Sequence, residues 1–145
     1  VGVLIGGVLS DKWVMKHLKG RIYTSVLGLS LTIPALFLLG NCSSIEAIIV
    51  GGMLFGLGFG IYDTNNMPIL CQFVSPRYRA TGYGIMNFVG ISAGAIITEF
   101  LGKATDTGGM GHVFVLLLFV VVAAIVLQLV SLHPKTVNMT EELVQ

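Results

Sequence analysis

The composition of this 145-residue chain separates it from water-soluble proteins. Its residues are 54% hydrophobic and only 10% charged, whereas an ordinary soluble domain is about 25% charged. Such a chain has too little polar surface to coat a globule in water, but a lipid bilayer can solvate it. The net charge of +1 leaves no basic field of the kind that nucleic-acid binding requires.

Four apolar stretches are long enough to cross a membrane, for which a helix needs roughly 20 residues. A shorter run at residues 1–9 is expected to be the last turns of a further span. Because the sequence starts inside this run and without methionine, we expect it to be the C-terminal part of a longer protein. In chain order the predicted spans are 1–9 (partial), 22–40, 45–74, 80–101 and 112–132, joined by loops at 10–21, 41–44, 75–79 and 102–111 and followed by a tail at 133–145.

The basic residues divide unevenly between the two ends of these spans. Cytoplasmic loops of membrane proteins are rich in lysine and arginine. One side of the predicted topology has only Lys103, and the other side has Lys12, Lys16, Lys19, Arg21, Arg77, Arg79 and Lys135. This split predicts a cytoplasmic C-terminal tail. A soluble helical core is the alternative, but the span at 112–132 has no polar face beyond Gln128, which a soluble helix of that length would need.

A loop motif follows the first, partial span. The segment 7–12 reads GVLSDK and is followed by further basic residues up to Arg21. It resembles the Gly-x-x-x-Asp-Arg/Lys loop of the major facilitator superfamily, which lies between the second and third helices of each six-helix half. The resemblance implies that Gly7, Asp11, Lys12 and Arg21 belong to the loop between helices eight and nine. The later part of the motif departs from the family pattern, with VMK at 14–16.

The long span at 45–74 carries an acid inside the predicted membrane region. At 100° per residue, one face contains Gly52, Gly56, Gly60, Asp63, Asn66, Met67 and Leu70, and Asn65 points the other way. The glycines predict close approach of another helix. A carboxylate in hydrocarbon is costly unless it is paired or hydrated, so Asp63 is a candidate for ion coupling or solute binding, with Tyr62 and Asn66 beside it. A structural acid paired elsewhere is an equally strong interpretation. Pro68 predicts a kink near this cluster.

A polar stripe also runs along the span at 80–101. Its members are Tyr83, Gly84, Asn87, Gly90, Gly94 and Thr98. The stripe predicts a helix that lines a cavity or packs closely, and helix packing is the stronger interpretation for the glycines Gly90 and Gly94. Asn87 is the better candidate for contact with a solute.

Two arginines, Arg77 and Arg79, precede this span. One hypothesis is that Asp11 pairs with Arg79 or Arg77 and caps the following helix in one conformational state. Breaking the pair would then shift the balance between inward-open and outward-open states. The alternative is that the arginines only anchor the cytoplasmic end of the helix.

The segments 55–63 (FGLGFGIYD) and 79–87 (RATGYGIMN) are also similar to bacterial major facilitator transporters, and most similar to the anion:cation symporter branch. The resemblance implies an all-α membrane protein of twelve helices in two halves, of which this chain is part of the C-terminal half. It further implies alternating access in a bacterial inner membrane, with a sugar, sugar acid or other organic anion as solute and H⁺ or Na⁺ as coupling ion. The partners are then the solute, the ion, the lipid bilayer and the missing N-terminal half, without which this part would not transport. No cofactor and no metal site are expected.

Three other functions compete with the symporter hypothesis. A multidrug-type efflux pump would have a more apolar cavity and less of the pattern around Asp63 and Asn87. A membrane enzyme would need convergent catalytic groups, but the histidines His17, His112 and His133 lie outside the apolar centres. A non-transporting sensor with a transporter fold would be recognised when the intact protein moves no solute.

Overall fold

The computed structural model describes residues 1–17, 19–42, 44–106 and 108–132, and all regular elements in these ranges are helices. The tail at 133–145, including Lys135 and His133, lies outside the described residues. In chain order the helices are α1 (Gly2–Val14), α2 (Gly20–Asn41), α3 (Ile45–Asp63), α4 (Asn66–Phe73), the 3₁₀ turn η1 (Pro76–Tyr78), α5 (Arg79–Asp106) and α6 (Met110–Ser131).

The described part of the chain contains four helical stretches long and apolar enough to cross a membrane: Gly20–Asn41, Ile45–Phe73, Pro76–Ala104 and Gly111–Ser131. This confirms the predicted all-α fold class. Two predicted loops are wrong in extent, because α1 continues to Val14 and α5 continues to Asp106. Hydropathy marks where a helix leaves hydrocarbon, whereas the helix itself ends only where the backbone changes, as at Gly108 with φ +72°.

The span predicted at 45–74 is broken into α3 and α4. Thr64 and Asn65 separate the two helices, one turn before Pro68. Proline has no N–H for the carbonyl four residues earlier, here that of Thr64, and its ring clashes with that carbonyl. Two hydrogen bonds close the end of α3: the α-helical bond from Thr64 N to Gly60 O at 3.3 Å, and a tighter bond across three residues from Asn65 N to Tyr62 O at 3.1 Å. The kink therefore lies at the place that the proline dictates.

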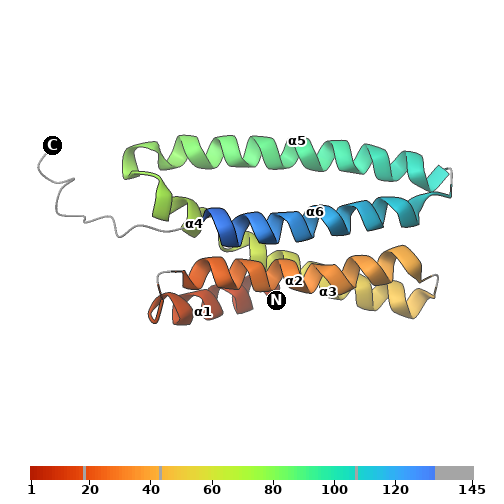
Figure 1. The fold of residues 1–145 in the computed structure, drawn as a ribbon, viewed down its shortest axis with the longest axis horizontal. Helices are drawn as coiled ribbons and strands as arrows, with labels where there is room; N and C mark the ends of the chain where they lie inside the picture. Colours follow the sequence, from red (N-terminus) through yellow and green to blue (C-terminus); the bar gives the residue numbers. More distant parts are fainter. Residues whose placement is uncertain (18, 43, 107, 133–145) are drawn as a thin grey trace, which may run out of the picture.

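Helix α2 is the centre of the bundle. It packs against α1, α3 and α6, and α1 also packs against α3 (Figure 1). Helix α5 is outermost and touches α6 and α4 over few residues. The buried side chains are accordingly concentrated in α1, α2, α3 and α4.

Glycine lets α1, α2 and α3 approach closely. A Cβ atom added at Gly28 of α2 would lie 2.6 Å from Tyr62 N and 2.7 Å from Gly58 O on α3. A Cβ atom at Gly6 of α1 would lie 2.8 Å from Ile61 Cα. No side chain fits at these distances, so the backbones themselves are in contact, as is common between membrane helices.

The predicted packing glycines are only partly those that the structure uses. Gly60 lies against α1, since its Cβ atom would be 3.0 Å from Val3 N. Within the described residues nothing lies within 4 Å of the Cβ positions of Gly52, Gly56, Gly90 or Gly94. Those four glycines therefore make no close helix contact in this part of the chain, and on α3 the contacts with α2 come from Gly51 and Gly58. Gly52 and Gly56 make no such contact because they lie on a different side of α3 from the one that packs against α2.

A polar contact holds α6 to α2. The Gln128 side chain donates from Nε2 to Ser25 Oγ at 3.0 Å. A hydrogen bond between helices in hydrocarbon contributes about 0.6 kcal/mol on average and up to about 2 kcal/mol. The one polar residue expected inside the last span therefore contributes to the attachment of that helix.

Two glycines of α3 provide a matched test of this packing. Replacing Gly58 with alanine should lower the unfolding free energy by about 1–3 kcal/mol, because the new methyl group meets the Gly28 carbonyl 2.7 Å away. Gly56→Ala is the control in the 145-residue chain, where nothing among the described residues lies within 4 Å of its Cβ position, and it should leave the unfolding free energy unchanged. Thermal unfolding of the purified protein measures both, and equal losses in the two variants would contradict the packing described here.

Candidate functional site

The predicted residues Tyr62, Asp63 and Asn66 lie together at the junction of α3 and α4. Asn66 donates from Nδ2 to Asp63 Oδ1 at 3.3 Å, and the Tyr62 hydroxyl interacts with the Asn66 side chain. Asp63 is exposed and Asn66 is half-buried. Because Asp63 ends α3 and Asn66 begins α4, the helix break places the two side chains side by side.

Asp63 has little compensation for its charge within the described residues. No ion pair in this part of the chain includes it, and its one hydrogen bond comes from a neutral amide. A carboxylate at membrane depth requires water, a proton or a cation in addition. The exposed face of α3 at Asp63 is therefore suited to meet an aqueous cavity or an ion.

A row of aromatic side chains leads to this cluster along α3, and the sequence analysis missed it. Phe55 and Phe59 stack with ring centroids 6.2 Å apart, and Phe59 lies at the same distance from Tyr62. Phe55 is 38% exposed and Phe59 is 49% exposed. Their spacing of four and three residues was the available signal. The row offers apolar ring faces next to the polar groups of Asp63 and Asn66.

The candidates on α5 lie apart from this cluster. Asn87 donates from Nδ2 to Tyr83 O at 3.1 Å, and Thr98 donates from Oγ1 to Gly94 O at 2.8 Å. Both side chains are exposed and hydrogen-bonded within their own helix. The described contacts therefore do not join Asn87 or Thr98 to Asp63.

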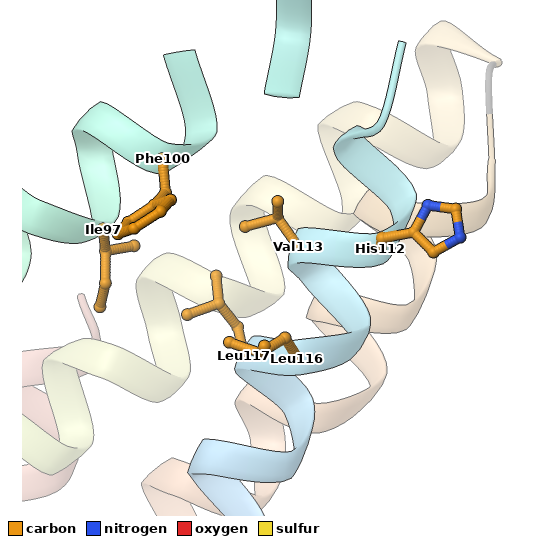
Figure 2. Close-up of a pocket in the computed structure, with 6 residues that line it drawn as sticks. All are labelled: Ile97, Phe100, His112, Val113, Leu116 and Leu117. Atoms are coloured by element: carbon orange, nitrogen blue, oxygen red, sulfur yellow. The ribbon is translucent and has the colours of Figure 1, made fainter. Parts of the chain in front are cut away.

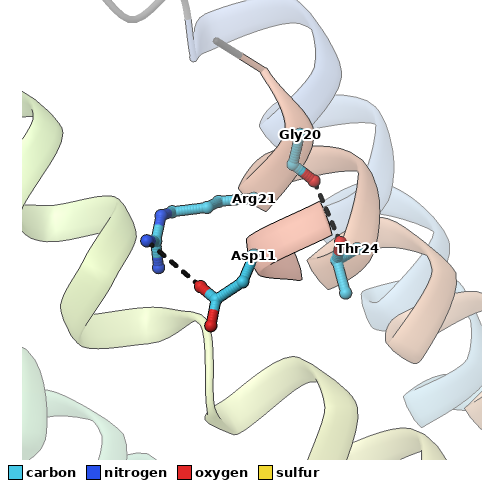
Figure 3. A network of polar contacts seen from close by, with 4 residues as sticks. All are labelled: Asp11, Gly20, Arg21 and Thr24. Atoms are coloured by element: carbon cyan, nitrogen blue, oxygen red, sulfur yellow. Dashed lines mark hydrogen bonds and ion pairs between the residues drawn. The ribbon is translucent and has the colours of Figure 1, made fainter. Parts of the chain in front are cut away.

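The loop motif forms an ion pair across the turn between α1 and α2. Arg21 NH2 lies 3.5 Å from Asp11 Oδ1 (Figure 3). The Asp11 side chain is 72% exposed, so this pair contributes about 0–1 kcal/mol to stability. Gly7 has open space beside it and Lys12 is exposed. The pair orients the turn and adds little to the stability of the fold.

The expected pairing of Asp11 with Arg77 or Arg79 is not the one in the structure. Arg79 donates from Nε to Val74 O at 3.2 Å and from NH2 to Cys71 O at 3.3 Å. The carbonyl groups at the end of α4 need donors, and Arg79 lies only a few residues further along the chain. Arg77 lies over the ring of Tyr78, with 5.6 Å from Cζ to the ring centroid. Asp11 meets Arg21 instead, because the turn after α1 is short.

Two cavities lie beside α6. The first is an apolar crevice of about 300 Å³ between α5 and α6, lined by Ile97, Phe100, His112, Val113, Leu116 and Leu117. In Figure 2 the His112 ring points away from the other labelled side chains. The second, of about 240 Å³, lies between α2, α3 and α6 and includes Tyr62, Gln128 and Ser131. Only the second cavity contains a predicted site residue.

The described residues hold no cluster of three or more histidine, cysteine, aspartate or glutamate side chains that could bind a metal ion. A transition-metal site of that kind is thus not formed within the described ranges.

The four span-length helices and the glycine contacts within the bundle define an integral membrane protein. The family model of the Major Facilitator Superfamily matches residues 1–142, and the chain therefore belongs to this superfamily. Its members are membrane transporters and not enzymes. No curated protein and no solved structure matches the chain.

The native Cys71 reports on the contact that Arg79 makes with α4. Replacing Arg79 with alanine should raise the rate of Cys71 alkylation by a maleimide several-fold, because the Cys71 and Val74 carbonyls lose their donor and the end of α4 opens more often. Arg77→Ala is the matched control and should leave the rate near that of the wild type. Faster alkylation in both variants would show that charge, and not the contact of Arg79, controls this turn.

Proposed function

We propose that this chain is the C-terminal part of a secondary active transporter that moves a small polar solute by alternating access, driven by H⁺ or Na⁺. The observation that carries the proposal is the exposed carboxylate of Asp63 at a break in a membrane-spanning helix. Among the described residues, Asn66 is the donor to this carboxylate. A proton or a cation would relieve the cost of this charge, and a change of its charge state would be felt at the hinge between α3 and α4.

The faces that lack neighbours support the proposed place of this chain in a two-half transporter. In this proposal α1 is the end of helix eight, α2 is helix nine, α3 and α4 form helix ten, and α5 and α6 are helices eleven and twelve. Gly52 and Gly56 on α3, and Gly90 and Gly94 on α5, have open space at their Cβ positions. These faces would meet the N-terminal half or the central cavity, so this part alone would not transport.

The aromatic rings beside Asp63 favour a solute with sugar-like C–H faces, and the proposed solute is a sugar, a sugar acid or a similar organic anion. Phe55 and Phe59 offer ring faces against which the C–H groups of a sugar can pack, and Asn66 offers an amide. In this proposal a carboxylate on the solute binds to basic residues in the N-terminal half. In this proposal Asp63 faces the central cavity, and the basic loops that contain Arg21 and Arg79 lie on the cytoplasmic side of the membrane.

An efflux pump of the same superfamily is the second candidate. The crevice of about 300 Å³ between α5 and α6 is lined almost entirely by apolar side chains, which would suit an amphipathic compound. None of the polar candidates for solute binding, such as Asp63, Asn66 and Asn87, lines this crevice. A sensor with a transporter fold remains the third, and it differs from both by moving no solute.

The role of Asp63 is tested in proteoliposomes that contain the full-length protein, with an imposed pH or sodium gradient and a panel of organic acids, sugars and neutral drugs. Asp63→Asn should reduce gradient-driven uptake at least about tenfold, which corresponds to 1.36 kcal/mol in the barrier. Exchange of labelled for unlabelled solute without a gradient should persist, because coupling is lost and the solute still binds.

Asp106→Asn is the matched control, since Asp106 is an exposed acid at the end of α5. It should leave uptake unchanged. Uptake that persists in Asp63→Asn would reduce Asp63 to a structural acid, uptake of neutral drugs alone would favour the efflux pump, and no flux of any compound would favour the sensor.

A further inference from the structure

A pair of buried oxygen atoms, one on α1 and one at the break between α3 and α4, has no hydrogen-bond partner among the described residues. They are Ser10 Oγ on α1 and Asn65 Oδ1 at the break between α3 and α4. Each residue is only 1% exposed. A buried polar atom without a partner is costly, and the few in a native protein require an explanation such as a bound water or ion.

The register of α1 against α3 places these two residues opposite each other. Gly2 of α1 lies against Leu57, and Gly6 lies against Ile61. One turn along α1 therefore corresponds to one turn along α3 in the same direction. The next pair in this series is Ser10 and Asn65. Neither oxygen atom has a hydrogen-bond partner among the described residues, so a small occupant at this level of the bundle would satisfy both.

The third helix contributes to the same layer. Gly28 of α2 also lies against Ile61, so Thr24, one turn earlier, lies at the level of Asn65. Thr24 is fully buried and donates its hydroxyl to Gly20 O at 3.0 Å (Figure 3). Its hydroxyl proton is thereby used, and only the lone pairs of Thr24 Oγ1 are available to a ligand.

The local hydrogen-bonding groups are mostly acceptors. Asn65 donates from Nδ2 to Ile61 O at 2.9 Å, which leaves Oδ1 as an acceptor. Pro68 has no N–H for the Thr64 carbonyl, and the end of α3 carries the negative end of the helix dipole. The Ser10 hydroxyl is the one donor of the set. An occupant that supplies positive charge fits this excess of oxygen lone pairs.

We propose that Ser10 Oγ, Asn65 Oδ1 and the Thr64 carbonyl, with Thr24 Oγ1 at the same level, form a binding site for one Na⁺ ion. Sodium is a hard cation that takes oxygen ligands. Carbonyl groups at the ends of broken helices coordinate sodium in several transporter folds. The neighbouring ion pair of Asp11 and Arg21 has no net charge and so does not oppose a cation.

This inference goes beyond the proposed function, because it places a Na⁺ ion on the face of the helix opposite Asp63, in addition to the proton or cation proposed for Asp63 itself. A Na⁺ ion there would bind α1 to the break between α3 and α4. Occupancy would stabilise one geometry of the kink, and that kink positions Asp63 and Asn66. Ser10 and Asn65 are thus ligands of this Na⁺ ion, and the coupling role proposed for Asp63 is separate from it.

The test measures thermal unfolding of the full-length protein in lipid nanodiscs, titrated with NaCl against KCl at constant ionic strength. The melting temperature of the wild type should rise with NaCl and not with KCl. Ser10→Ala should raise the NaCl concentration at half-effect at least about tenfold, because the ion loses one ligand. Ser30→Ala is the matched control, because Ser30 is exposed on α2 and donates to Val26 O at 2.8 Å. It should respond as the wild type does.

Asn65→Asp keeps the test decisive where Ser10→Ala fails to fold. The added carboxylate should lower the NaCl concentration at half-effect about tenfold or more. Asp63→Asn should retain the sodium response even where it has lost coupled transport, which separates this inference from the proposed function.

Three results would overturn the inference. Equal melting temperatures in NaCl and KCl, for both the wild type and Asn65→Asp, would mean that a water molecule and not Na⁺ satisfies the two oxygen atoms. A sodium response that survives unchanged in Ser10→Ala would remove Ser10 as a ligand. A response that is lost in Asp63→Asn and kept in Ser10→Ala would place the ion at Asp63.

Discussion

Direct contact between the backbones of α1, α2 and α3 is the constraint on which the rest of this structure depends. Lipid solvates apolar side chains as well as the protein interior does, so helices in a bilayer associate through close packing and hydrogen bonds. Gly6 and Gly28 bring the backbones of α1 and α2 against Ile61 of α3. The bundle is therefore tight around α3, whereas α5, which touches α6 and α4 over few residues, has mostly exposed side chains.

This packing divides the broken helix of α3 and α4 into two faces. Ile61, Asn65 and Ile69 are buried against the neighbouring helices, and Asp63 is exposed on the other side. Pro68 imposes the break between these groups, so a change in the kink would move both faces together. A transporter that must couple an ion to a solute can use such an element, because events on one face alter the geometry of the other.

Much of this arrangement could be predicted from the sequence. Hydropathy identified the four spans, and a period of 100° per residue separated Asn65 from the face of Asp63, as its 1% exposure confirms. The proline predicted the kink. These features depend on local sequence and on the thickness of the bilayer, which act before any tertiary contact is known.

The rest depended on contacts between helices, which a single sequence does not specify. Glycine periodicity predicted Gly52 and Gly56 as packing sites, but α2 packs against the face of α3 that contains Gly51 and Gly58. In this structure Asp11 pairs with Arg21 and not with Arg77 or Arg79, because the choice among several nearby bases depends on the length of the turn before α2. Ser10 could not be linked to Asn65 until the register of α1 against α3 was known.

The two-faced helix is tested most directly by the accessibility of single cysteines along it. In the full-length protein with Cys42 and Cys71 replaced, cysteines placed at residues 61, 63, 65 and 66 would be treated with a charged, membrane-impermeant thiol reagent, with and without solute. The account predicts labelling at 63 and 66 that the solute reduces, and little or no labelling at 61 and 65. Equal labelling at all four positions, or labelling at 65 without labelling at 63, would contradict the division of faces and the site built on it.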